Sequence, residues 1–137
     1  MIKIVKQGLI IGIVNLLVGL IFNQTVGLLF PGITQEYVRS GLFRPWTDPL
    51  MMAFFLYPFI LGLVLAYFWS RFGKQIEGKT SSAKALNFAK LYFLIATVPG
   101  MFVSYTSFRV SALMIGSWTL TGFVEAFVAG WILAKSK

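Results

Sequence analysis

Long apolar runs separated by short polar segments make up most of this chain. The first run covers about residues 7–30, and no charged residue lies between Lys6 and Glu36. Three more runs cover about residues 50–70, 85–106 and 110–134. A helix needs about 20 mostly apolar residues to cross the hydrocarbon core of a bilayer, and each run is long enough. The pattern therefore predicts an all-α integral membrane protein, a bundle of four transmembrane helices.

The composition agrees with this class of protein. Of 137 residues, 58% are hydrophobic and only 12% are charged, whereas a soluble domain is about 45–50% apolar and about 25% charged. A soluble domain of this length has too much surface relative to its volume to bury so many apolar side chains. We expect one transmembrane domain over residues 1–137, with the lipid bilayer as its main partner.

The basic residues predict an orientation, because cytoplasmic loops of membrane proteins are rich in Lys and Arg. Of the 12 basic residues, only Arg39, Arg44 and Arg109 lie in the connections after the first and third spans. The others flank the termini and the middle connection: Lys3, Lys6, Arg71, Lys74, Lys79, Lys84, Lys90, Lys135 and Lys137. We therefore expect both termini in the cytoplasm. Basic residues that flank spans argue against a nucleic-acid partner.

Two connections suggest local structure. Residues 33–43, between the first two spans, could form a short helix that lies on the bilayer surface. Thr80, Ser81 and Ser82 precede the third span and are typical helix-capping residues. No organellar targeting segment precedes the first span, so the cytoplasmic (inner) membrane is the expected location.

Most catalytic and metal-binding chemistry lacks its residues here. The chain has no Cys and no His, which removes disulfides, thiol nucleophiles, and the usual zinc and haem ligands. Its acids are Glu36, Asp48, Glu77 and Glu125, at spacings that suit neither a carboxylate pair nor a divalent metal site. We therefore expect no enzymatic activity, no metal and no cofactor.

Small residues indicate where helices pack, because close approach of backbones drives association in lipid. Gly8, Gly12 and Gly19 share one face of the first span with Asn15, and Gly122 and Ala129 lie on a similar face of the fourth. The Gly8–Gly12 pair is also a weak indication of a homodimer.

Two prolines interrupt spans, Pro58 in the second and Pro99 in the third. Each removes a backbone hydrogen bond and can kink its helix. A fixed kink is the favoured interpretation, since membrane helices tolerate kinks readily. A hinge is the alternative.

Glu125 is the most unusual residue, because an acid at the centre of a membrane helix costs about 2.5–3.5 kcal/mol on insertion scales. Such residues usually face the bundle interior and have a partner. At about 1.5 Å per residue, Glu125 and Asn15 both lie roughly 14–15 Å from the basic ends of their spans. We therefore predict that Glu125 faces Asn15, with Lys90 of the third span as a counter-ion.

Three roles for Glu125 stay open: a structural contact, a site for a proton or cationic substrate, and a contact with another subunit. The leading hypothesis is a multi-pass membrane protein that serves as a structural, assembly or accessory subunit of a membrane complex. The alternative is a small proton- or cation-coupled transporter that works as a homodimer around Glu125. Four spans with one membrane acid resemble the plan of the small multidrug transporters, although their acid lies in the first span, where this chain has Asn15.

Overall fold

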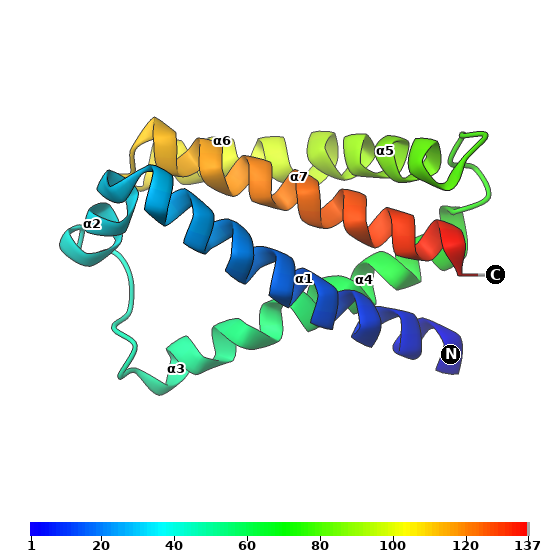
Figure 1. Ribbon diagram of the computed structural model, residues 1–137, viewed down its shortest axis with the longest axis horizontal. Coiled ribbons are helices and arrows are strands. Elements are labelled where there is room, and N and C mark those ends of the chain that lie inside the picture. The colour runs from blue at the N-terminus through cyan, green and yellow to red at the C-terminus, as the bar shows by residue number, and fades with distance from the viewer. Residues whose placement is uncertain (137) are drawn as a thin grey trace.

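The computed structural model describes residues 1–136 and consists of helices joined by short connections (Figure 1). Four helical segments are long and apolar enough to span a membrane: Ile2–Leu29, Pro49–Phe72, Ser81–Ser107 and Ala112–Lys135. The described residues contain no strand. The prediction of an all-helical chain with four helices of spanning length is confirmed, whereas membrane insertion and the side of each terminus stay predictions. Lys137 lies outside the described residues.

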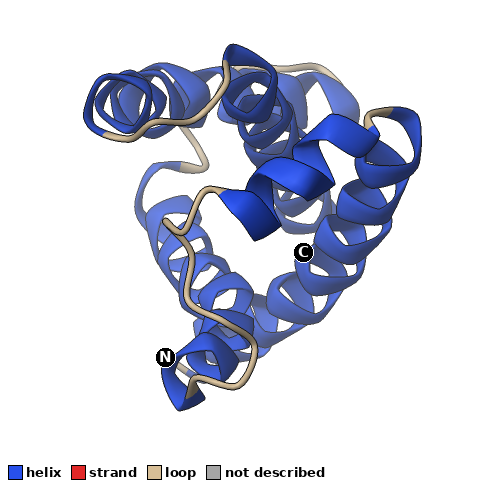
Figure 2. Cartoon of the chain, turned by 90° about the vertical axis from the view of Figure 1, so that its left-hand side faces the viewer, coloured by secondary structure: helices blue, strands red, loops and turns tan. Residues whose placement is uncertain are grey.

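Both termini lie at one end of the bundle, with the connection between the second and third segments (Figure 1). We call this the terminal end, and the opposite end the distal end. The first segment is helix α1 (Ile2–Leu29), and the fourth is helix α7 (Ala112–Lys135). Figure 2 views the bundle from the distal end. Most basic residues of the chain therefore gather at the terminal end, as expected from the sequence.

The second and third segments each change helix type at a proline. The second segment consists of α3 (Pro49–Met52), the 3₁₀ helix η1 (Ala53–Leu56) and α4 (Tyr57–Phe72). The third segment consists of α5 (Ser81–Tyr92), the π-helix η2 (Phe93–Thr97) and α6 (Val98–Ser107). Pro58 directly follows the start of α4, and Pro99 follows the start of α6. A proline ring in a regular α-helix clashes with the carbonyl four residues earlier. The altered turns before both prolines accommodate that clash, while their use as hinges stays a prediction.

A short helix, α2 (Pro31–Arg39), follows α1 where the sequence suggests one over residues 33–43. It packs against the start of α7, where Glu36 Oε1 accepts a hydrogen bond of 2.6 Å from the backbone N–H of Ser111. The Trp118 indole N–H donates to the Tyr37 hydroxyl beside it. These contacts hold α2 against the bundle. Its position at a bilayer surface stays a prediction.

Capping side chains begin three of the helices. Thr80 caps α5 by accepting a hydrogen bond from the Ala83 N–H, as the sequence suggests. Ser111 caps α7 by accepting a hydrogen bond from the Met114 N–H. Asp48 caps α3 through the Leu50 N–H. Each cap satisfies a backbone donor that has no partner within its helix.

Two apolar cores lie at the two ends of the bundle. The terminal core draws residues from all four segments: Ile11, Leu65, Ala66, Ile76, Phe88, Ala129 and Leu133. The distal core joins α1, α2 and α7 around Ile33, Val110 and Met114. Neither core includes a residue of α3 or η1, and Figure 1 shows α3 diverging from α1 and α7. Helices α3 and η1 therefore lie outside both cores, whereas the long helices α1, α4, α5 and α7 meet in one core or the other.

Helices α1 and α4 cross with their backbones in contact. A Cβ atom at Gly8 would lie 2.8 Å from Leu63 Cα, and one at Gly12 would lie 2.8 Å from Phe59 Cα. A Cβ at Gly62 would lie 2.9 Å from the Gly12 nitrogen. The face that carries Gly8 and Gly12, which suggested a homodimer, is thus covered by α4 of the same chain.

Helices α5 and α7 form the second close pair. Ala129 is fully buried, and a Cβ at Gly130 would lie 3.1 Å from Ala85 Cα. At Gly122 the added Cβ would meet Thr97 at an ordinary 3.8 Å. Ala129 and Gly130, not Gly122, therefore provide the tightest approach to α5.

Candidate functional site

Glu125 lies on the buried side of α7, and only 8% of its surface is exposed. Its carboxylate points at Gly19 of α1, because a Cβ built on Gly19 would lie 3.1 Å from Glu125 Oε1. A larger side chain at position 19 would compete for this space. Gly19, expected to serve helix packing, therefore also makes room for the carboxylate.

Asn15 lies one helical turn before Gly19, so both residues share one face of α1. Its side chain is 0% exposed, and neither its amide nitrogen nor its oxygen has a hydrogen-bond partner within residues 1–136. A buried polar group without a partner costs about 1–3 kcal/mol. The structure thus places Asn15 one turn along α1 from the glycine that approaches Glu125, without a hydrogen bond between Asn15 and Glu125 among the described residues.

Lys90 does not neutralise Glu125 in the part of the chain that the structure describes. Its side chain is exposed, because Ala85, Phe88 and Ala89 form the buried face of α5 and Lys90 lies to one side of that face. Between described residues, the pair of Arg44 with Asp48 is the one salt bridge. Glu125 is left with neither an ion pair nor a hydrogen bond from those residues.

Two tyrosines lie in the same region of the bundle as Glu125. The hydroxyls of Tyr57 from α4 and Tyr92 from α5 lie close to each other, and both are within electrostatic range of the Glu125 carboxylate. Each long segment therefore contributes one polar side chain, and we call Asn15, Tyr57, Tyr92 and Glu125 the polar cluster. Tyr57 is 47% exposed, so the cluster extends to the surface of the bundle at this residue.

The sequence pattern did not indicate Tyr57 or Tyr92 as neighbours of Glu125. Counting residues inward from the basic end of the third span could have indicated Tyr92, because Tyr92 lies only two residues beyond Lys90. Its orientation depends on the rotation of α5, which packing against α7 determines. Buried Thr97 of η2 lies beside Gly122 of α7. Gly122 precedes Glu125 by about one helical turn, so Thr97 also lies near this region.

The donor set of the cluster is one carboxylate with amide and phenol oxygens. Within residues 1–136, no three His, Cys, Asp or Glu residues come together as a metal site would require. One acid among neutral oxygens and aromatic rings suits a proton or a singly charged cation. Comparisons with protein-family models, curated proteins and solved structures give no match to this chain.

Proposed function

We propose that this chain is a small non-enzymatic membrane protein that binds either a proton or a cation at Glu125. Exchange of one for the other would couple proton transport to cation transport. One observation carries the proposal: Glu125 is buried beside Gly19 without an ion pair or a hydrogen bond from the described residues. Ionisable residues inside a membrane commonly mark proton relays or ion and substrate pathways. A purely structural role for Glu125 would be better supported by a partner such as Lys90.

The physical basis of coupling is competition for one carboxylate. A charged carboxylate without a partner is very unfavourable in an apolar interior, so Glu125 must gain a proton or a cation. It cannot hold both at once, and binding of a cation therefore releases the proton. This exchange is the elementary step that a proton-coupled transporter requires.

The surroundings of Glu125 favour an organic cation. Tyr57 and Tyr92 lie within electrostatic range of Glu125, and aromatic rings of this kind attract an ammonium group. The free oxygen of Asn15 can accept a hydrogen bond from it. Four helices of one chain enclose little space, so a complete pathway would lie between two protomers, as in a homodimer.

Infrared difference spectroscopy in lipid tests the site directly. We expect a carboxyl band that titrates in the native chain, shifts when tetraphenylphosphonium is added, and is absent in Glu125→Gln. Glu77→Gln, which removes an exposed acid outside the four long segments, is the matched control and should keep the band. A band that the cation does not shift would overturn the proposed cation site.

Flux measurements then test transport. We load liposomes that contain the protein with a pH-sensitive dye and add tetraphenylphosphonium outside. Protons should leave the liposomes in exchange for the entering cation, and the dye should report the resulting rise in internal pH. Glu125→Gln should reduce this response to that of empty liposomes, and Glu77→Gln should leave it unchanged. Equal flux in the native chain and in Glu125→Gln would exclude a proton-coupled role for Glu125.

The second candidate is an accessory or assembly subunit, for which the loose packing of α3 and η1 is the specific support. Helix α3 and η1 contact each other and η1 continues into α4, but both pack little against the other segments. A transmembrane helix of another protein could occupy this side of the bundle. Cation-coupled flux by the purified protein alone would contradict this candidate.

A further inference from the structure

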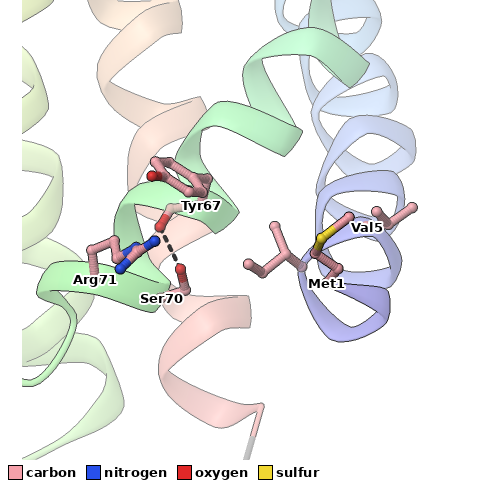
Figure 3. A pocket seen from close by; sticks show the side chains of 6 residues that line it. Met1, Val5, Tyr67, Ser70 and Arg71 are labelled. Carbon is pink, nitrogen blue, oxygen red and sulfur yellow. Dashed lines mark hydrogen bonds between the residues drawn. The ribbon is translucent and has the colours of Figure 1, made fainter.

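An open cavity of about 530 Å³ lies at the terminal end, between α1 and α4. Figure 3 shows Met1 and Val5 of α1 opposite Tyr67, Ser70 and Arg71 of α4. The cavity exists because α1 and α4 touch at their glycine crossing and separate beyond it. We call it the terminal groove. It lies apart from the polar cluster, and nothing in the proposed function uses it.

The groove combines an apolar wall with one cationic side chain. Ile4 and Val5 contribute aliphatic side chains, and Tyr67 contributes its ring. The Arg71 guanidinium lies 5.5 Å from the centre of that ring. Ser70 donates its hydroxyl hydrogen to the Tyr67 carbonyl at 2.6 Å, so Arg71 is the anion-binding group of the groove. Its guanidinium forms no salt bridge with any described residue.

The surrounding charge has the same sign. Lys3 and Lys6 are exposed on the first turns of α1, and Lys74 is exposed just beyond α4. This clustering of basic side chains attracts anionic headgroups at a membrane surface. A ligand of the groove would therefore carry an anion next to an apolar chain.

We propose that the terminal groove binds an anionic phospholipid, with the phosphate at Arg71 and an acyl chain along Ile4, Val5 and the Tyr67 ring. Arginine presents several N–H donors in a fork that matches phosphate oxygens. The groove lies at the end of the long apolar segments, at the level where lipid phosphates would meet the helices. Free phosphate shares the anionic group but gains nothing from the apolar wall.

Binding of labelled lipids to the purified full chain in detergent micelles tests this site. We expect phosphatidylglycerol to bind more tightly than phosphatidylcholine. Arg71→Gln should weaken phosphatidylglycerol binding by about tenfold, the effect of losing one charge-assisted hydrogen bond. Lys79→Gln removes an exposed charge from the nearby connection and should change binding by less than about twofold.

Further variants separate the possible sources of the anion. Arg71→Lys should retain an intermediate affinity, and Val5→Phe, which fills the apolar wall, should weaken lipid binding while Arg71 is intact. Displacement of the lipid by millimolar inorganic phosphate would instead indicate a site for the free anion, and would overturn the lipid proposal. Equal binding of both lipids, or unchanged binding in Arg71→Gln, would overturn it as well. Size-exclusion profiles identify any variant that fails to fold.

Discussion

Asn15 occupies a position where stability and ligand binding make opposite demands. Both polar atoms of its side chain are buried and lack partners within residues 1–136. An apolar side chain of similar size would avoid the cost of the unpaired amide. The presence of Asn15 is therefore explained if a ligand completes its hydrogen bonds, one helical turn from the glycine that approaches Glu125.

We expect Asn15→Leu to increase stability and weaken cation binding. Removal of the unpaired amide should stabilise the bundle by about 1–3 kcal/mol, measured as a higher thermal midpoint in detergent. The shift of the Glu125 carboxyl band by a primary alkylammonium ion, which can donate a hydrogen bond to the Asn15 oxygen, should decrease. Asn23→Leu changes an exposed residue of the same helix and is the control for both measurements. A lower midpoint in Asn15→Leu would instead show that Asn15 supports the fold.

The close helix pairs show which features of packing the sequence reveals. Gly8 and Gly12 form a recognisable small face, but their partner Gly62 is a single glycine in an apolar span. The rotation of α5 was also not predictable from the sequence, where Lys90 was expected to face inward as the counter-ion of Glu125. Its buried face consists of Ala85, Phe88 and Ala89, so close packing determines the rotation and leaves Lys90 outside.

Gly62→Ala should disrupt the crossing of α1 and α4. The new methyl group would meet backbone atoms of Gly8 and Gly12, which cannot move without separating the helices. We expect a loss of about 1–3 kcal/mol, the usual range for an overpacked contact, seen as a lower thermal midpoint. At Gly116 of α7 an added methyl group meets nothing within 4 Å, so Gly116→Ala should be neutral or slightly stabilising. Equal midpoints for the two variants would contradict the crossing.

The start of α3 depends on one charged pair. Asp48 Oδ2 accepts a hydrogen bond of 2.7 Å from Arg44, and Asp48 Oδ1 caps the Leu50 N–H at 2.9 Å. The hydrogen bond from Arg44, followed by that from Leu50, lowers the pKa of Asp48 from its ordinary value of 3.8. A lowered pKa means that the contribution of this contact is present above pH 3.8 and is lost as the pH falls through the folded-state pKa.

Arg44→Gln should therefore raise the pKa of Asp48 toward its ordinary value. Asp48 is the only Asp in the chain, so ¹³C labelling of Asp carboxyl carbons gives one assignable NMR signal. Arg39→Gln, which removes a basic residue at the end of α2, should leave the titration unchanged. The same titration curve in the native chain and in Arg44→Gln would rule out the pair.

At the scale of the whole molecule, the number of long helices was predictable, because apolar runs report the length of a span directly. The relative placement of the helices was not predictable to the same degree. In a membrane protein the exterior is as apolar as the interior, so hydrophobicity does not identify the inward face. Asn15 and Glu125 were nevertheless assigned to the interior, because their polarity is costly in lipid. The contribution of Gly19, Tyr57 and Tyr92 required the structure.

The two ends of the bundle differ in charge, and this difference makes the orientation testable. The chain has no native Cys, so single cysteines can be labelled without background. Thr47 lies in the connection after the first span and Lys79 in the connection after the second, and both are exposed. We expect a membrane-impermeant maleimide to label Thr47→Cys in intact cells, and Lys79→Cys only after permeabilisation.

Exposed Ser136, at the end of the fourth helix, provides an independent check. Four spans place the connection at Lys79 and the C-terminal end on the same side, so Ser136→Cys should behave like Lys79→Cys. The reverse pattern at all three sites would keep four spans but invert the orientation, moving the terminal groove to the outer leaflet. Opposite labelling of Lys79→Cys and Ser136→Cys would mean that the third and fourth helices do not both cross the membrane. Because Glu125 is in the fourth helix, that result would also remove the basis for an intramembrane carboxylate.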